Sequence, residues 1–225
     1  GGALFVVVSL VRVVTDADAL TSSITVGAAL RSTIPILLAG LAALWADRVG
    51  IVNIGIEGMM ILGTWFGGWA AWQWGAWVGV IFAVLGGMIG GLIHCTAVTR
   101  FNVDHIISGV AINILAFGAM RYLSELLFVG QQGGGITQSP QQSSSIGKVS
   151  LPFLSGGAGT ADALGNLEDR GWFLISDAAG ITRGLTIDVS YLSIIALMLV
   201  PISAYILWRT RFGLRVRSSG EQPYA

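Results

Sequence analysis

Residues 76–98 read AWVGVIFAVLGGMIGGLIHCTAV, and this stretch decides the fold class of the chain. It contains no Asp, Glu, Lys or Arg, and it is apolar along almost its whole length. A helix needs about 20 apolar residues to cross the hydrocarbon core of a bilayer. Because an isolated helix satisfies its own backbone hydrogen bonds in lipid, the stretch predicts a membrane-spanning α-helix.

Four further stretches are comparably long and apolar, and they cover residues 26–44, 51–71, 104–129 and 189–208. Residues 1–14 resemble the end of a sixth helix that is truncated at its start. The strands of a membrane barrel would alternate in polarity over about 10 residues, whereas these stretches are continuously apolar. We therefore predict an all-α, polytopic transmembrane bundle of about six helices.

The overall composition agrees with a membrane protein. The chain is 54% hydrophobic and 11% charged, whereas a soluble domain usually carries about 25% charged residues. A net charge of +0 gives no support for binding nucleic acid. The first residue is not Met and the last lies in a charged segment, so we expect a fragment truncated at both ends.

Residues 130–188 interrupt the apolar pattern. They are rich in Gly, Ser and Pro and include both acidic and basic residues. This composition predicts a long water-facing loop, with one short helix near residues 161–167. Connections of this length are usually functional or disordered.

The arginines in the short connections predict the orientation of the bundle, because cytoplasmic loops are enriched in Lys and Arg. Arg48, Arg100 and the arginines of 209–217 fall on one side of a six-helix arrangement. That side is predicted to be cytoplasmic, which places the loop 130–188 outside the cell membrane. Arg12 falls on the predicted outer side and is the exception.

Glu57 is the strongest candidate for a functional residue, because an ionisable side chain inside a membrane span is costly and usually functional. Asn53 lies four residues earlier and is expected to share a helix face with it. Gly50, Gly55 and Gly58 predict a broken or re-entrant start to this helix. Irregular backbone at membrane depth is tolerated only against protein or a water-filled cavity. We predict that Asn53 and Glu57 lie near a translocation path; the alternative is a structural carboxyl bonded to a neighbouring helix.

The stretch 104–129 supplies two more candidates for the substrate pathway, Ser108 and Asn113. Ser108 is expected near the cytoplasmic end of its helix. Asn113 lies deeper, and it either bonds a neighbouring helix or lines the path. Arg121 and Glu125 are four residues apart and are expected to pair on one helix face.

Other polar or aromatic residues are expected to have structural roles. His94 is expected to be a packed, hydrogen-bonded histidine. The tryptophans around residues 72–75 are expected to form a belt at the membrane–water interface. The chain contains no HExxH zinc motif and no GxxxxGK[ST] phosphate loop. Its two histidines and one cysteine are scattered, so we expect no metal, no cofactor and no enzymatic activity in this chain.

Three segments resemble ABC-importer permeases of the branched-chain amino acid, ribose and nucleoside group, and most of all the nucleoside-type permeases. They are ADRVGIVNIGIEGMM at 46–60, RFNVDHIISGVAIN at 100–113 and TRFGLRVRSSGEQP at 210–223. The resemblance implies that residues 1–225 belong to a single transmembrane permease domain. It also implies that ATP is hydrolysed by a separate subunit.

The resemblance further implies that residues 209–225 form the cytoplasmic loop that leads into a coupling helix. Family members usually have Ala and Asn where this chain has Ser219 and Gln222. Positive-inside anchoring of residues 209–217 is compatible with the coupling role. The expected contacts with the ATPase are Arg211, Gly213, Arg215, Gly220, Glu221 and Pro223.

The partners implied by the resemblance are a second related permease, cytoplasmic ATP-binding subunits and an external substrate-binding lipoprotein. The implied function is ATP-driven import through the cell membrane, with nucleosides favoured over the sugars or branched-chain amino acids of the same family. Two alternatives remain open from the residues alone. One is an ion-coupled secondary transporter with Glu57 as the coupling carboxylate, and the other is a membrane scaffold.

Overall fold

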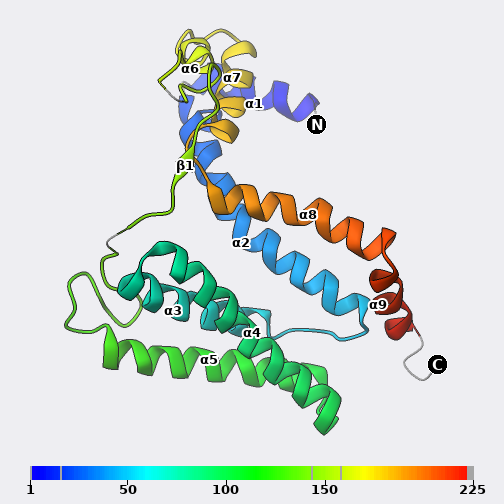
Figure 1. Cartoon of the computed structure of the whole chain (residues 1–225). Coiled ribbons are helices and arrows are strands. Elements are labelled where there is room, and N and C mark those ends of the chain that lie inside the picture. The colour runs from blue at the N-terminus through cyan, green and yellow to red at the C-terminus, as the bar shows by residue number, and fades with distance from the viewer. Residues whose placement is uncertain (1, 16, 143, 158, 222–225) are drawn as a thin grey trace. The chain divides into compact units, whose positions relative to one another are not determined.

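The structure is a computed structural model that describes residues 2–15, 17–142, 144–157 and 159–221 (Figure 1). Helices dominate this part of the chain. Pro223, one of the predicted coupling residues, lies outside the described residues. In chain order the elements are α1 (Gly2–Thr15), η1 (Asp18–Leu20), α2 (Ser23–Arg48), α3 (Ile56–Trp74), α4 (Ala76–Phe101), α5 (His105–Leu127), β1 (Lys148–Val149), α6 (Ala163–Glu168), α7 (Ile175–Thr186), β2 (Val189–Ser190), α8 (Tyr191–Arg209) and α9 (Arg211–Glu221).

The predicted all-α membrane class is confirmed, and each of the six apolar stretches contains a helix of the described structure. Four of these described helices, α2, α4, α5 and α8, are long and apolar enough to cross a membrane. Helix α3 has 19 residues, but its glycines, tryptophans and Glu57 lower its mean hydropathy. Helix α1 is apolar and covers 14 residues.

The chain divides into two compact units, which are described separately. The first comprises residues 1–38 and 147–200, and the second comprises residues 39–146 and 201–225. Helices α2 and α8 contribute residues to both units. The single permease domain expected over 1–225 therefore stays a prediction.

In the second unit, helices α3, α4 and α5 pack together around small residues (Figure 1). A Cβ atom at Gly63 would lie 2.9 Å from the carbonyl oxygen of Ala83, and one at Gly67 would lie 2.9 Å from the Cβ of Ala83. Glycine is therefore required where α3 meets α4. Small residues on a helix face let two backbones approach closely, and such close packing helps helices to associate in lipid.

An aromatic core lies between α3 and α5. Trp65 is buried with Met120 and Phe128, and its indole Nε1–H donates a hydrogen bond of 2.9 Å to the Oγ of Ser124. The Trp65 and Phe128 rings stack with their centroids 5.3 Å apart. Trp65, expected with the interfacial tryptophans, is thus a core residue, whereas Trp74 and Trp77 near the next turn are exposed. The interfacial belt stays a prediction.

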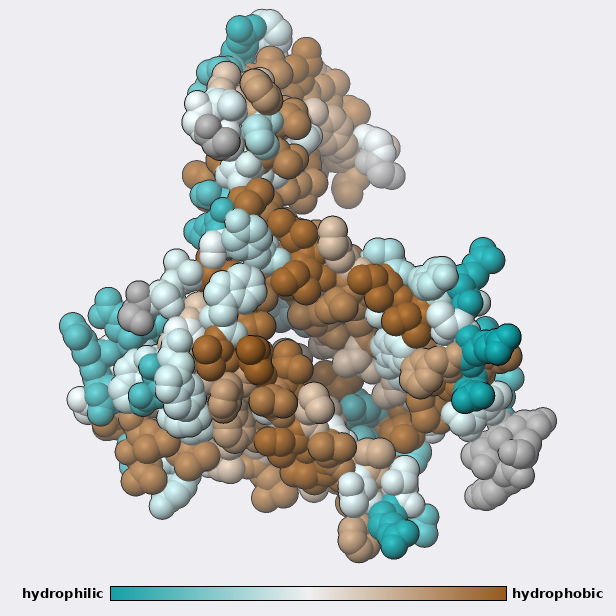
Figure 2. Space-filling view, viewed as in Figure 1, coloured by the Kyte–Doolittle hydropathy of each residue, from teal (hydrophilic) through white to brown (hydrophobic). Residues whose placement is uncertain are grey.

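The outward surfaces of these helices are apolar, as Figure 2 shows by the extent of brown surface. Large exposed side chains on α4 and α5 account for much of it. In a soluble protein such a surface would drive aggregation, whereas lipid solvates it. Among the exposed residues are Ile81, Leu85, Met88, Leu92, Ile107, Ile114, Leu115, Phe117 and Leu126.

In the first unit, the residues after 147 contain more secondary structure than the predicted loop. Helix α6 falls where the short helix near 161–167 was expected. Helix α7 was not predicted, because its Gly, Ser, Thr and Asp residues give it a loop-like composition. Strands β1 and β2 pair antiparallel over two residues each, so a minimal sheet is present beside the predicted helices.

Two ion-pair clusters hold this unit together. The Nε of Arg12 lies 2.6 Å from the Oδ1 of Asp177, and both side chains are buried. Thr21 donates a hydrogen bond of 2.5 Å to the same Asp177 oxygen. In the second cluster, Arg183 lies 2.6 Å from Asp162 and 3.1 Å from Glu168. Arg12, predicted as an exception among loop arginines, is therefore a buried structural residue.

Candidate functional site

The start of helix α3 is broken, as the glycines predicted. Residues 51–55 are not helical, and α3 begins at Ile56. The expectation that Asn53 and Glu57 share a helix face is wrong, because Asn53 precedes the first helical residue. Instead, the Oδ1 of Asn53 accepts a hydrogen bond of 3.0 Å from the backbone N–H of Gly55. Asn side chains stabilise turns in this way by bonding their own backbone two residues on.

Asn113 on α5 caps this broken helix from outside. Its Oδ1 accepts a hydrogen bond of 2.7 Å from the N–H of Gly58, and its Nδ2 donates one of 3.1 Å to the carbonyl of Ile54. The first four N–H groups of a helix have no partner within the helix, and Gly58 carries one of them. Of the two roles open to Asn113 from the sequence, the structure shows the bond across helices.

Close backbone contact accompanies this cap. A Cβ atom at Gly58 would lie 2.8 Å from the carbonyl oxygen of Ile112, and one at Gly109 would lie 2.8 Å from the backbone nitrogen of Gly55. Neither backbone atom can move aside as a flexible side chain would. Glycine at these positions therefore lets the non-helical segment lie directly on α5.

Ser108 lies in a different environment from the other candidates. It is buried, and its Oγ is 3.0 Å from the Nδ1 of His94 on α4. The packed, hydrogen-bonded His94 is confirmed. Ser108 thus joins α4 to α5, and its role in a substrate pathway stays a prediction.

Glu57 lines a cleft of about 650 Å³ between α3, α5 and the segment 136–139. Its side chain is exposed rather than packed between helices. Arg121 lines the same cleft, eight residues beyond Asn113 on α5. Because α5 rises by about 1.5 Å per residue, Arg121 lies roughly 12 Å along the helix axis from the level of Asn113 and Gly58. The cleft is therefore lined by both an acidic and a basic side chain.

Arg121 does not form the expected pair with Glu125, since no ion pair joins these two described residues within 4.0 Å. Besides the two charged side chains, the cleft offers hydrogen-bonding groups and aromatic surface. Thr64, Gln138 and Ser139 supply hydroxyl and amide groups, while the Phe117 ring is well exposed. The arrangement suits a polar molecule that also has a flat apolar face.

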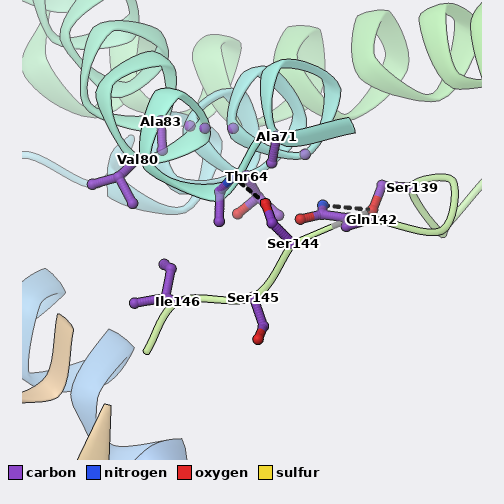
Figure 3. A pocket seen from close by; sticks show the side chains of 14 residues that line it. Thr64, Ala71, Val80, Ala83, Ser139, Gln142, Ser144, Ser145 and Ile146 are labelled. Carbon is purple, nitrogen blue, oxygen red and sulfur yellow. Dashed lines mark hydrogen bonds between the residues drawn. The ribbon is translucent and has the colours of Figure 1, made fainter. Parts of the chain in front are cut away.

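A second cavity, of about 750 Å³, adjoins the first (Figure 3). Small residues of α3 and α4 form one wall, and residues from 139–142 and 144–146 form the other. Thr64 and Ser139 line both cavities. Ser144 points toward the helices, where its Oγ accepts a hydrogen bond of 3.0 Å from the N–H of Ala76. The sequence did not single out this segment, whose only signal is its run of Ser and Gln.

The remaining predicted residues lie on α9. Thr210 caps this helix, since its Oγ1 accepts a hydrogen bond of 3.1 Å from the N–H of Gly213 and donates one of 2.6 Å to the carbonyl of Ile206. Gly213 is buried at this corner with α8. Arg211, Arg215 and Glu221 are exposed, and Gly220 is partly buried. The structure thus brings Asn53, Glu57 and Asn113 together, while Ser108 and the α9 residues occupy other places.

Comparison with known proteins agrees with this architecture. The profile of the family described as "Branched-chain amino acid transport system / permease component" matches residues 25–225. No solved structure matches the chain significantly.

Several curated proteins are similar to the chain. The guanosine ABC transporter permease protein NupQ of Bacillus subtilis is 34% identical over 210 residues, which cover 90% of this chain and 57% of that protein. The nucleoside ABC transporter permease protein NupC of Lactococcus lactis is 28% identical over 85% of this chain and 54% of its own length.

A putative glucose ABC transporter permease protein, TsgC13 of Haloferax volcanii, is 27% identical over 84% of this chain and 49% of its own length. The chain thus spans about half the length of the curated relatives that it matches. The profile match nevertheless covers nearly the whole chain. This multi-pass membrane chain belongs to the permease-component family of branched-chain amino acid transport systems.

Proposed function

We propose that this chain is the membrane-spanning permease subunit of an ATP-driven ABC importer for nucleosides. Family membership supports the permease role, and two relatives are named for guanosine and for nucleosides. The observation that carries the substrate class is the cleft that both Glu57 and Arg121 line. ATP hydrolysis belongs to partner subunits in this proposal, and the chain itself needs no cofactor or metal.

The spacing of the two charges argues against a branched-chain amino acid as the substrate. The ammonium and carboxylate groups of an α-amino acid are attached to one carbon. Contact with both protein charges favours a longer molecule, because the backbone positions that carry them differ by roughly 12 Å along the helix axis. A nucleoside is longer, and it carries ribose hydroxyls that hydrogen-bond to a carboxylate. Its base presents a flat face to Phe117 and polar edges to Arg121 and Gln138.

A sugar matches the polar groups of the cleft, but it has no aromatic ring that could stack on Phe117. Aromatic side chains add stabilisation beyond area burial when a second ring stacks against them. The exposed Phe117 ring beside the polar wall therefore favours a nucleoside over a hexose.

The proposed assembly includes a second related permease, cytoplasmic ATP-binding subunits and an external substrate-binding lipoprotein. Exposed arginines on α9 support its placement at the cytoplasmic surface, since Lys and Arg accumulate on that side. With this orientation, residues 130–188 lie outside the cell membrane, where a binding protein delivers substrate.

The test is uptake of labelled guanosine by the assembled transporter in proteoliposomes, with ATP inside and loaded binding protein outside. We expect Glu57→Gln to raise the KM for guanosine by roughly tenfold or more, because a lost hydrogen bond to a charged group costs about 1.5–3 kcal/mol. Glu125→Gln is the matched control, since Glu125 is exposed on α5 and does not line the cleft. Stimulation of the ATPase by glucose or leucine, but by no nucleoside, would overturn the substrate assignment.

The same vesicles test the ion-coupled alternative, which the exposed carboxylate of Glu57 keeps open. Uptake that collapses with an uncoupler at constant ATP would favour ion coupling. We expect uptake to depend on ATP and to persist when the proton gradient is removed.

A further inference from the structure

The C-terminus of α2 ends in a turn that only glycine fits well. Gly50 has φ of 81°, in the region that side chains other than glycine rarely adopt. The N–H of Ile51 donates to the carbonyl of Ala46, and the N–H of Gly50 donates to that of Asp47, each at 3.0 Å. This pair of bonds is a Schellman motif, which fixes the direction of the chain as it leaves a helix.

The last turn of α9 lies directly on this turn. A Cβ atom at Gly220 would lie 2.5 Å from the carbonyl oxygen of Arg48 and 3.0 Å from the backbone nitrogen of Gly50. A Cβ atom at Gly50 would in turn lie 3.2 Å from the Cα of Gly220. The contact is therefore backbone against backbone, with no side chain between the two segments.

Contacts with aromatic rings also join the end of α2 to the α8–α9 corner, beside the contact between Gly50 and Gly220. The guanidinium carbon of Arg48 lies 5.2 Å from the centroid of the Trp208 ring at the end of α8. The rings of Trp45 on α2 and Phe212 on α9 lie 6.3 Å apart. The end of α2 is thus held both by the α8–α9 corner and by the last turn of α9.

Beyond Gly50, five residues lead to the first turn of α3, and several of them are tied to α5. The N–H of Val52 donates a hydrogen bond of 3.3 Å to the Nδ1 of His105. Asn113 holds the carbonyl of Ile54 and the N–H of Gly58. In the chain, Glu57 lies between Ile54 and Gly58, which are both bonded to Asn113. A shift of residues 51–55 would therefore move the Glu57 carboxylate, which lines the cleft.

We infer that Gly50 and Gly220 form a steric joint through which displacement of α9 moves residues 51–55 and reorients Glu57 in the cleft. This inference rests on the proposed contact of α9 with the ATP-binding subunit. Two backbones in contact cannot absorb a displacement by changing a side-chain rotamer, so motion of one is passed to the other. The five-residue link is too short and too tightly bonded to absorb it either.

The test uses the complete transporter in nanodiscs, with hydrogen exchange of residues 49–57 and of α9 measured in the resting and the ATP–vanadate-trapped states. We expect exchange in both segments to change together in the wild-type protein. In Gly220→Ala, whose added methyl separates the two backbones, α9 should still respond while residues 49–57 respond less. In proteoliposomes, guanosine uptake per ATP hydrolysed should fall at least about fivefold, a factor at the lower end of common allosteric couplings.

Gly40→Ala is the matched control, because a Cβ atom there meets nothing within 4 Å, and it should behave as the wild type. The inference is overturned if residues 49–57 of the wild-type protein keep their exchange rates while those of α9 change. It is also overturned if Gly220→Ala assembles and transports at the wild-type ratio. Failure of the proposed substrate would appear separately, as vanadate-dependent exchange changes without guanosine uptake by the wild type.

Discussion

At the scale of single residues, two asparagines use their side chains to replace the backbone bonds that a broken helix loses. Asn53 serves the turn before α3, and Asn113 serves both sides of the break from a neighbouring helix. The Glu57 side chain takes no part in these bonds, and no described residue donates a hydrogen bond to its carboxylate within 3.5 Å. Its carboxylate is available to the cleft because Asn53 and Asn113 make the hydrogen bonds that the break in the helix requires.

Replacing Asn113 with alanine should lower the stability of the chain in detergent, because the N–H of Gly58 and the carbonyl of Ile54 would both lose their partner. We expect a cost of about 1–3 kcal/mol, the penalty for a buried polar group left unpaired. The measurement is the thermal unfolding temperature, followed by tryptophan fluorescence.

Thr96→Ala is the control for this change, because among the described residues the Thr96 hydroxyl bonds only the carbonyl of Leu92, in its own helix. It should leave the unfolding temperature nearly unchanged. Equal unfolding temperatures for the Asn113 variant and the wild type would show that water or lipid headgroups replace the cap.

At the scale of secondary structure elements, glycines set how closely the helices approach. Gly58 and Gly109 place α3 and α5 in backbone contact, and Gly63 and Gly67 do the same for α3 and α4. In lipid there is no hydrophobic drive between helices, so close packing and interhelical hydrogen bonds carry the association. Helix α3 is therefore held on two sides, although it is not among the four described helices that are long and apolar enough to cross a membrane.

Gly58→Ala should push α3 away from α5, because its Cβ would lie 2.8 Å from the carbonyl oxygen of Ile112 and 2.9 Å from the Cα of Asn113. Overpacking of this kind costs about 1–3 kcal/mol, and it also lengthens the bond from Gly58 to Asn113. Thermal unfolding in detergent measures the loss, and guanosine uptake should fall with it.

Gly118→Ala on α5 is the matched control, because a Cβ atom there meets nothing within 4 Å. Alanine is favoured over glycine inside a helix by up to about 1 kcal/mol. This variant should be as stable as the wild type or slightly more stable. If Gly58→Ala matches it, the close contact does not set the helix spacing.

At the scale of the whole molecule, each of the two units is stabilised internally by a different kind of interaction. The second unit depends on apolar and glycine packing, whereas the first depends on buried or half-buried ion pairs around α7. Arg183 lowers the pKa of Asp162 by hydrogen bonding to its carboxylate, and the N–H of Gly165 lowers it further. The same bonds to Asp162 and Glu168 raise the pKa of Arg183.

The stability of the segment 147–188 should therefore depend on pH and decrease in acid. Because the folded-state pKa of Asp162 lies below its unfolded value of about 4, its contribution is complete above that pH. The contribution is lost as the pH falls through the lower, folded-state pKa. Hydrogen exchange of residues 147–188 between pH 7 and pH 3 measures this loss.

Asp162→Asn should raise exchange at neutral pH and converge with the wild type in acid. Asp169→Asn is the control, since Asp169 forms no ion pair with another described residue, and it should keep the wild-type pH profile. Parallel profiles for wild type and Asp162→Asn over the whole range would contradict the role of this pair.

Much of the bundle was predictable because crossing a bilayer is a local requirement. The count of apolar residues in one stretch predicts a span, as in residues 76–98, without knowledge of any neighbour. The broken start of α3 was predictable for the same reason, since Gly50, Gly55 and Gly58 lie within one short segment. Helix α7 was not, because its polar composition gives no apolar stretch, and its order depends on Asp177 and Arg183 finding partners elsewhere.

The sequence by itself determined the helical membrane class and the family, and it singled out Glu57 as a candidate. Only the tertiary structure decided that Asn113 caps α3, that Arg12 pairs with Asp177 and that Gly220 lies on Gly50. Each of these contacts joins residues that are distant along the chain. Their spacing carries no periodic signal, so they are set by which backbones approach closely enough once the helices have packed.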